Sequence, residues 1–375
     1  MNAENLIIGA GPSGLAMAAR LKQAGLSYVI LEQANKVGSK WHQHYDRLHL
    51  HTVKELSCLP YVDFPDHYPQ YISKFQLIEY FNSYVEKFEI KPEFNSTVTS
   101  VKKLNSNWTV ECSNGKIYTA KNVVVASGLN RVPSIPIWKG LELFKGEVMH
   151  ASTYKNAQVF LGKKVLVVGM GNTGAELALD LAEQKIEVSL SVRGEITIVP
   201  RDFLGRSVQL TANKLNKLPY VIGDWIGSLS GKIAFGNLRK YGLPISNIPP
   251  AKMRRVFGKT PTIDIGTVAK IKSGEIKVRK GIAALTENGV VFTNGISEKY
   301  DVLLLATGYT ASLKDFILAK DSLFIENGEP AKKLAHDEEE GLYFLGFEKY
   351  TYGGTLGTLK AESELILKNI IFNSR

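Results

Sequence analysis

The stretch VLVVGMGNTGAELALDLAEQKIEVSLSVR, residues 165–193, has the order of an apolar strand, a glycine turn, a helix and a second strand. A glycine turn between a strand and a helix lets backbone N–H groups approach a pyrophosphate at the positive end of the helix dipole. Residues 165–193 therefore predict one complete dinucleotide-binding unit.

A second unit of the same layout opens the chain. Residues 5–32 carry the turn G-A-G-P-S-G at positions 9–14, between an apolar strand and a helix rich in small residues. One G-x-G-x-x-G motif is weak evidence, because glycine turns also serve ordinary strand-to-helix packing. Two of them, each between a strand and a helix, predict an α/β fold of the three-layer type with two Rossmann-like domains.

The two units differ at the end of the second strand, where the ribose of the dinucleotide is recognised. Glu32 ends the first, Y-V-I-L-E, and its carboxylate suits the ribose hydroxyls of FAD or NAD and repels a 2′-phosphate. Arg193 ends the second, V-S-L-S-V-R, and its guanidinium can bind a 2′-phosphate in bidentate fashion. That end suits NADPH.

Composition excludes several other classes of protein. A chain of 375 residues is too long for one compact core, so two domains are expected. The net charge of +10 comes from Lys and Arg distributed along the chain instead of forming one block, which favours anionic cofactors and acidic substrates over a nucleic-acid partner. Cys58 and Cys112 lie outside any C-x-x-C motif, so no redox dithiol is expected.

Targeting segments are not expected either. Strand-forming residues begin at Leu6, and nowhere are eighteen apolar residues consecutive. We therefore predict a cytoplasmic protein with no membrane partner. A homodimer is left open.

The domain organisation follows from the two motifs. Residues 1–155 and 290–375 are predicted to form a discontinuous FAD domain, with a small β-meander near residues 97–118 and a helix at residues 75–88. Residues 156–289 are predicted to form an inserted NADPH domain with a helical insert at about residues 206–259. That insert either lines a substrate entrance or caps the domain.

Two further features bear on the flavin site. Residues 37–51 are rich in aromatics and histidines, and Trp41 is either a wall for a flat ring or an ordinary packing residue. The four histidines between positions 42 and 51 lack the spacing of metal ligands, so no metal site is expected. Two apolar runs end in A-S-G and A-T-G, at Gly128 and Gly308, where backbone can approach a planar cofactor.

The stretch FKGEVMHASTY, residues 144–154, carries the pattern F-x-G-x-x-x-H-x-x-x-Y. This pattern resembles the fingerprint of the flavin-containing monooxygenases and their Baeyer–Villiger relatives, in which it links the FAD and NADPH domains. His150 and Tyr154 are then either structural hydrogen-bonding groups at a linker or proton-transfer groups.

Three more stretches, residues 45–51, 192–201 and 258–278, resemble the plant YUCCA-type flavin monooxygenases, which convert indole-3-pyruvate to indole-3-acetate. The resemblance covers nearly the whole chain. YUCCA-type sequences resemble this chain in having histidine at position 51, where animal-type enzymes carry an asparagine beside the flavin. A C-terminal membrane helix like that of the animal enzymes is not expected.

The resemblance implies a chemistry. NADPH reduces FAD, oxygen adds to the reduced flavin as a peroxide, and the peroxide oxygenates a small organic substrate. His51 and Asn172 are the candidate catalytic groups that steer the peroxide, although Asn172 is also placed to cap its helix. Indole-3-pyruvate is the favoured substrate. The alternatives are N- or S-oxygenation of amines and sulfides, Baeyer–Villiger oxidation, electron transfer to a separate carrier, and a nucleic-acid binding module.

The residues expected to contact FAD are Gly9, Gly11, Pro12, Ser13, Gly14, Glu32, Gln33, Trp41, Val98, Gly128, Gly308 and Gly346. Those expected to contact NADPH are Gly169, Gly171, Asn172, Thr173, Gly174 and Arg193.

Overall fold

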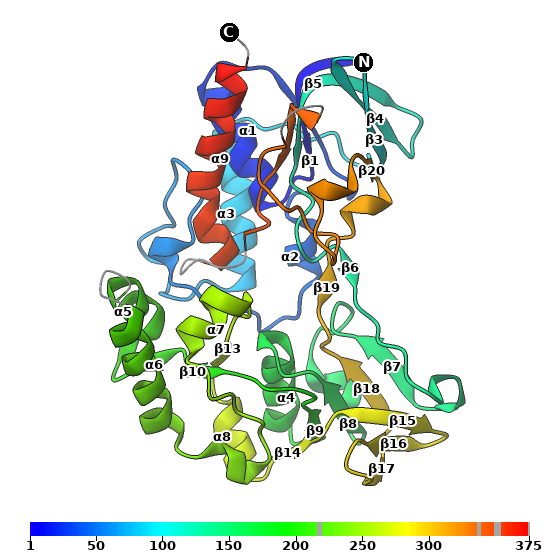
Figure 1. Cartoon of the computed structure of the whole chain (residues 1–375), viewed down its shortest axis with the longest axis vertical. Helices are drawn as coiled ribbons and strands as arrows, with labels where there is room; N and C mark the ends of the chain where they lie inside the picture. Colours follow the sequence, from blue (N-terminus) through cyan, green and yellow to red (C-terminus); the bar gives the residue numbers. More distant parts are fainter. Residues whose placement is uncertain (216–219, 336–338, 349–353, 374–375) are drawn as a thin grey trace. The chain divides into compact units, whose positions relative to one another are not determined.

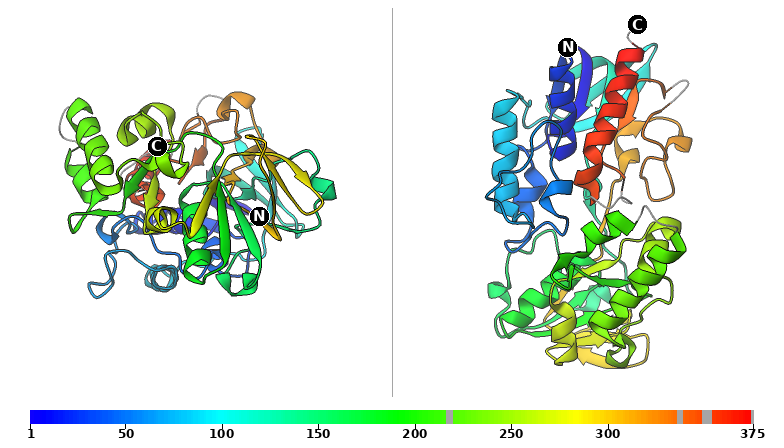
Figure 2. Two further views of the ribbon diagram at one scale, coloured as in Figure 1. Left: turned by 90° about the horizontal axis from the view of Figure 1, so that it is seen from below. Right: turned by 90° about the vertical axis from the view of Figure 1, so that its left-hand side faces the viewer.

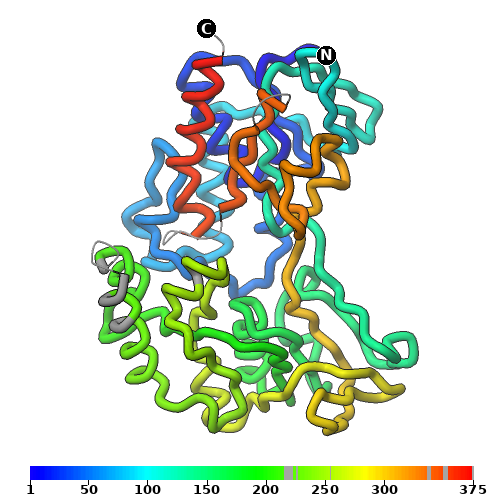
Figure 3. The backbone as a smooth tube through the Cα atoms, in the orientation of Figure 1, coloured from blue at the N-terminus to red at the C-terminus, as the bar shows by residue number. Residues whose placement is uncertain are grey.

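The computed structural model describes residues 1–215, 220–335, 339–348 and 354–373. The chain forms two compact units, which Figure 1 shows with their elements labelled. The N-terminal unit comprises residues 1–43, 48–132 and 309–375, and the central unit comprises residues 44–47 and 133–308. Figure 3 follows the chain from the first unit into the second and back.

A seven-stranded sheet runs through the N-terminal unit in the order β2-β1-β5-β4-β3-β20, with β21 also paired to β5. β1 (Asn2–Ile8) lies parallel to β2 (Tyr28–Leu31) and to β5 (Ile117–Val125). The other edge of β5 pairs first with β4 (Asn107–Cys112), antiparallel, and then with β21 (Leu342–Phe344), parallel. The end of the predicted meander, near residue 118, and the apolar run before A-S-G at Gly128 thus belong to one continuous strand, β5.

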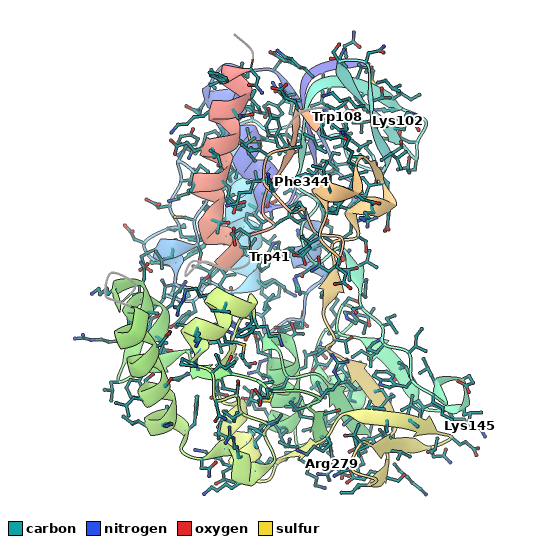
Figure 4. All side chains as sticks on the ribbon, viewed as in Figure 1. Trp41, Lys102, Trp108, Lys145, Arg279 and Phe344 are labelled. Carbon is teal, nitrogen blue, oxygen red and sulfur yellow. The ribbon has the colours of Figure 1, made fainter. Side chains whose placement is uncertain are left out.

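Apolar residues alternate between the two faces of this sheet, as the two-residue period of a strand requires. On β1, Ile7 belongs to one buried cluster, whereas Leu6 and Ile8 belong to another. The cluster around Ile7 is shared with α1 (Pro12–Gln23), which packs against both α3 (Lys74–Lys87) and α9 (Gly354–Phe372). Figure 2 shows these three helices beside one another. Trp108 and Phe344, labelled in Figure 4, are buried in the opposite cluster.

The predicted helix at residues 75–88 is confirmed as α3 (Lys74–Lys87). Ser73 caps it, since its hydroxyl accepts a hydrogen bond from the Gln76 backbone while the Gln76 side chain accepts one from the Ser73 backbone. Residues at helical spacing, Leu77, Tyr80, Phe81 and Tyr84, are buried against the cluster that contains α1.

The central unit is built on a five-stranded parallel sheet in the order β14-β9-β8-β18-β7. β8 (Lys164–Val168), α4 (Asn172–Glu183) and β9 (Glu187–Ser191) confirm the predicted strand–turn–helix–strand unit. The other strands are β14 (Ile276–Arg279), β18 (Val302–Leu305) and β7 (Glu147–His150). A small antiparallel sheet precedes β18 and consists of β15 (Ile282–Thr286), β16 (Gly289–Phe292) and β17 (Ser297–Lys299).

The central unit spans more of the chain than the expected NADPH domain. It begins at Pro133 instead of residue 156 and ends at Gly308 instead of residue 289. The reason is strand pairing: β18 lies between β8 and β7, so both strands belong to the central sheet. The A-T-G end at residues 306–308 therefore lies in the central unit.

The segment expected to be a helical insert lies between β10 (Ile198–Pro200) and β13 (Thr262–Asp264), which pair in parallel. It contains α5 (Val208–Leu215), α6 (Tyr220–Phe235) and α7 (Pro250–Phe257).

The remaining elements are short. They are α2 (Ser39–Gln43), α8 (Thr267–Lys272), β3 (Val98–Leu104), β6 (Val132–Pro133), β11 (Asp202–Phe203), β12 (Arg206–Ser207), β19 (Tyr309–Thr310), β20 (Ile317–Leu318) and 3-10 turns that include η1 (Lys54–Leu56) and η3 (Ala157–Phe160). None of the helices within the described ranges is long and apolar enough to cross a membrane.

Candidate dinucleotide sites

The glycine turn of the N-terminal unit has two crowded glycines and one that faces open space. Gly9 has φ +103°, and a Cβ there would come within 2.8 Å of the Ala126 carbonyl oxygen. A Cβ on Gly14 would come within 1.8 Å of the Gly9 carbonyl oxygen. A Cβ on Gly11, at the N-cap of α1, would meet nothing within 4 Å. Gly9 and Gly14 are thus required for packing, whereas Gly11 leaves room in front of the helix.

The turn of the central unit repeats this geometry. Gly169 has φ +104°, and a Cβ there would come within 2.7 Å of the Ala306 carbonyl oxygen. A Cβ on Gly174 would come within 1.9 Å of the Gly169 oxygen, and one on Gly171, the N-cap of α4, would meet nothing within 4 Å. In both units the open position lies at a helix N-terminus, where a pyrophosphate fits and a Cβ would intrude.

Glu32 is buried at the end of β2, next to the first turn. Its Oε2 accepts a hydrogen bond from the Ala10 backbone N–H at 2.8 Å, and its Oε1 accepts one from the Ala34 backbone N–H at 2.9 Å. The Ser39 hydroxyl lies 3.3 Å from Oε1. These donors fix the carboxylate beside the turn, which is the position from which a ribose is recognised.

Arg193 follows β9 and is exposed. Its side chain lies over Gly281, since a Cβ at that glycine would come within 3.2 Å of Arg193 Cγ. Within the described part of the chain its guanidinium has no ion pair and no hydrogen-bond partner. It is therefore available to an anionic group of a ligand.

Asn172 is the first residue of α4, but its side chain does not cap that helix. Its Oδ1 instead accepts a hydrogen bond from the Ile263 backbone N–H at 2.8 Å. The Thr262 hydroxyl donates to the Met170 carbonyl oxygen at 2.7 Å, inside the glycine turn. Residues 262–263 thus fasten β13 to the turn. The sequence did not assign Thr262 and Ile263 to the site, because a hydroxyl 92 residues and a backbone amide 91 residues away carry no motif.

The other predicted FAD-side residues are distributed over the N-terminal unit. Pro12 and Ser13 open α1, and a Cβ on Gly346 would come within 2.0 Å of Ser13 Oγ, so Gly346 lies directly against the turn. Gln33 is exposed after Glu32, and Val98 is half-buried at the start of β3. Gly128 has φ +80° and faces open space.

Trp41 and His51 belong to the same unit. Trp41 is half-buried in α2, with its ring 6.3 Å from that of Phe81 in an edge-on arrangement, which gives the packing interpretation an observed partner. Figure 4 labels Trp41. His51 is half-buried in the loop before η1. Gly308 and Asn172, in contrast, lie in the central unit.

His150, at the end of β7, is buried and hydrogen-bonded on both ring nitrogens. Nδ1 accepts from the Ser152 backbone N–H at 3.1 Å, so this nitrogen carries no proton. Nε2 lies 3.1 Å from the Gly308 carbonyl oxygen and donates to it. Burial lowers the pKa of His150 below its ordinary value, against the opposing effect of the Gly308 carbonyl. His150 is therefore a neutral imidazole that holds the A-T-G strand end in place.

Tyr154 is hydrogen-bonded to α4 through Asp180. Its hydroxyl donates to Asp180 Oδ2 at 2.6 Å, and its ring stacks on Phe160. Burial and the neighbouring Asp180 carboxylate raise the pKa of Tyr154. Arg47 binds the same helix, with Nη1 3.3 Å from Asp180 and 2.7 Å from Glu183.

The other two named positions of the pattern at residues 144–154, Phe144 and Gly146, have packing roles. Phe144 belongs to a buried cluster, and a Cβ on Gly146 would come within 2.5 Å of the Phe144 ring and 2.7 Å of the Asp301 carbonyl oxygen. Each named position of F-x-G-x-x-x-H-x-x-x-Y therefore has a structural role inside the central unit, which favours the structural interpretation of His150 and Tyr154.

Among the described residues, no three or more His, Cys, Asp or Glu side chains are grouped so that they could hold a metal ion.

Comparison with known proteins shows which family the chain resembles. The model of the family described as flavin-binding monooxygenase-like matches residues 3–327. The indole-3-pyruvate monooxygenase YUCCA4 of Oryza sativa subsp. japonica is 36% identical, covering 93% of this chain and 84% of its own. The indole-3-pyruvate monooxygenase YUCCA6 of Arabidopsis thaliana is 38% identical, covering 97% and 90%.

Solved structures show the same fold at lower identity. A flavin-containing monooxygenase from Stenotrophomonas maltophilia superimposes with a TM-score of 0.76 at 18% identity, covering 100% of this chain and 99% of that one. Cyclohexanone monooxygenase from Rhodococcus sp. Phi1, bound to NADP⁺, gives 0.73 at 20% identity, covering 100% and 85%. The bacillithiol disulfide reductase of Staphylococcus aureus gives 0.68 at 17%, covering 98% and 99%, so the fold alone does not fix the reaction.

The predicted α/β fold with two Rossmann-like domains is thus confirmed. The family match over residues 3–327 goes further than the fold, because it covers both glycine turns and the fingerprint between them. Identities of 36% and 38%, over more than nine-tenths of this chain, agree with it. The chain belongs to the flavin-binding monooxygenase-like family, and it is an oxidoreductase that uses FAD and NADPH.

Proposed function

We propose that this enzyme oxidatively decarboxylates indole-3-pyruvate to indole-3-acetate. The observation that carries this proposal is the similarity, over more than nine-tenths of the chain, to several relatives named as indole-3-pyruvate monooxygenases. The two turns, with an open glycine before each helix, support the use of two dinucleotides in the same chain.

We assign FAD to the turn of the N-terminal unit, with Gly11, the start of α1 and Glu32 as its main contacts. NADPH is assigned to the turn of the central unit, with Gly171, the start of α4 and Arg193. When bound, FAD takes two electrons from NADPH and supplies them to oxygen. The helix N-termini would stabilise the two pyrophosphates, and Arg193 would bind the 2′-phosphate.

The overall reaction balances without a further redox partner. Indole-3-pyruvate, O₂, NADPH and a proton give indole-3-acetate, CO₂, NADP⁺ and water. The bond between the keto carbon and the carboxylate breaks, and the keto carbon becomes the carboxylate carbon of the product. One oxygen atom of O₂ enters the product and the other enters water.

His51 and Asn172 remain our candidate catalytic residues. Because Asn172 Oδ1 is occupied by the Ile263 N–H, its Nδ2 is the group left to donate a hydrogen bond to a cofactor or substrate. The His51 ring nitrogens can donate or accept a hydrogen bond.

Incubation with NADPH and indole-3-pyruvate, followed by chromatography of the products, tests the proposal. We expect NADPH-dependent indole-3-acetate above the yield of a reaction without enzyme. For comparison, the enzyme is assayed in the same way with a sulfide, a tertiary amine and a cyclic ketone as alternative substrates. Oxygenation of these alternative substrates with no indole-3-acetate would replace the proposed substrate by a general N-, S- or Baeyer–Villiger reaction.

We also propose a cytoplasmic location, which the two free buried cysteines, Cys58 and Cys112, support. The homodimer stays a prediction, which light scattering of the purified protein would check.

A further inference from the structure

The helical insert of the central unit has an unusual charge. The 61 residues between β10 and β13, residues 201–261, contain eleven Lys and Arg but only two Asp and no Glu, a net charge of +9. The whole chain carries +10, so the other 314 residues are almost neutral. The positive charge, which we expected to be distributed along the chain, is therefore concentrated in this insert.

The insert also exposes large apolar side chains. Leu204 is 86% exposed, Ile233 65% and Phe257 53%. Leu210, Leu229 and Val256 are exposed as well. Solvated helices ordinarily place such residues in the core, so their number here needs a cause.

Cations and exposed apolar side chains alternate on the helices at one-turn spacing. Lys214 follows Leu210 by four residues on α5, and Lys232 follows Leu229 by three on α6. Lys252 precedes Val256 by four residues on α7. Residues three or four apart share one face of a helix, so each of these three lysines lies beside an exposed apolar side chain. All three lysines are exposed.

This combination distinguishes between anionic partners. Nucleic acid is bound by cations together with aromatic rings that stack on bases. Among the six exposed apolar residues named above, only Phe257 is aromatic. Aliphatic side chains that enter the acyl boundary, beside lysines that reach the headgroups, are typical of interfacial helices on anionic lipid.

We propose that the insert helices α5, α6 and α7 form a surface that binds anionic phospholipid membranes from one side. The earlier expectation of no membrane partner rested on the absence of long apolar runs, which governs spanning and does not bear on surface binding. The cytoplasmic leaflet carries such lipids, in agreement with the proposed location.

Sedimentation of the flavin-loaded enzyme with vesicles tests the proposal. We expect binding to vesicles of phosphatidylcholine with phosphatidylglycerol, little binding to phosphatidylcholine alone, and release by salt. Each cation at the surface contributes roughly fivefold to partitioning, so Lys214→Gln with Lys252→Gln should lower it on the order of 20-fold. Ile233→Ser with Phe257→Ser should also weaken it.

A matched control changes one exposed isoleucine and one exposed lysine of the same unit outside the insert, Ile137→Ser with Lys299→Gln. It should bind like the unaltered enzyme. Hydrogen exchange of the unaltered enzyme gives a second measurement that needs no variant. Anionic vesicles should protect amides of α5 to α7 and leave α1 and α3 unchanged.

Four results would overturn the assignment: equal binding to neutral vesicles, no binding to either kind, equal loss in the control variant, or protection outside the insert. Tight salt-sensitive binding to a DNA oligonucleotide, with no vesicle binding, would identify nucleic acid as the partner instead.

Discussion

At the scale of single residues, two glycines of the turn in the central unit have different roles, Gly171 in the proposed cofactor binding and Gly174 in packing. Gly171→Ala should leave stability unchanged, because its Cβ meets nothing, but it should raise the KM for NADPH by intruding on the pyrophosphate. Gly174→Ala should instead destabilise the fold by about 1–3 kcal/mol, because its Cβ overlaps the Gly169 carbonyl. Thermal unfolding and NADPH titration check the pair. A Gly171→Ala enzyme with an unchanged KM for NADPH would contradict the assignment of the site.

Arg193 should set the preference between the two nicotinamide cofactors. Arg193→Gln should raise the KM for NADPH roughly 10- to 100-fold, since a charge-assisted hydrogen bond is worth about 1.5–3 kcal/mol. The KM for NADH and the unfolding temperature should not change, because the side chain is exposed. Steady-state kinetics with both cofactors measures this, with Lys185→Gln, an exposed cation of the same unit, as control. Equal effects on both cofactors would argue against 2′-phosphate recognition.

His150 should make stability depend on pH. Its pKa is lowered in the folded protein, so its contribution is fully present above the unfolded value of about 6.5 and is lost as the pH falls toward the folded pKa. His150→Gln should therefore flatten the decline of the unfolding temperature below pH 6.5, whereas His67→Gln, at an exposed position, should keep it. Identical pH profiles for the unaltered protein and His150→Gln would show that this histidine is not the cause.

At the scale of elements, α4 is held by a cluster formed from Tyr154, Asp180 and Arg47. Tyr154→Phe should cost about 1–3 kcal/mol, because it removes the donor of a mostly buried carboxylate. Combined with Arg47→Ala it should show a coupling energy of about 0.5–3 kcal/mol, as expected for partners of one group. Urea unfolding of the single and double variants measures both. Glu147→Gln, which breaks the exposed ion pair with Lys163, should cost less than about 1 kcal/mol.

The sequence predicted those elements whose signal is local. β8, α4 and β9 were located from an apolar run, a glycine turn and a helical period, all within 30 residues. The partner of β18 was not predicted, because the run V-L-L-L carries no information about which strand it joins, and β8 lies more than 130 residues earlier. The hydrogen bond of Asn172 to Ile263 was missed for the same reason.

At the scale of the whole molecule, the number of dinucleotide units and their order were predictable, because each unit has its own motif. The limits of the central unit were not predictable from the sequence. They depend on the pairing of β18 with both β7 and β8, which lie far from it in the chain. The identity of the substrate comes from relatives and not from geometry, since a disulfide reductase shares the fold.

We propose that this one chain uses FAD and NADPH to insert one atom of O₂ into a keto acid. The most direct test is turnover of indole-3-pyruvate under ¹⁸O₂ with mass spectrometry of the product. We expect one ¹⁸O atom in each indole-3-acetate and one CO₂ released for each NADPH consumed. Indole-3-acetate without ¹⁸O, or NADPH oxidation that yields only hydrogen peroxide in the presence of this substrate, would contradict it.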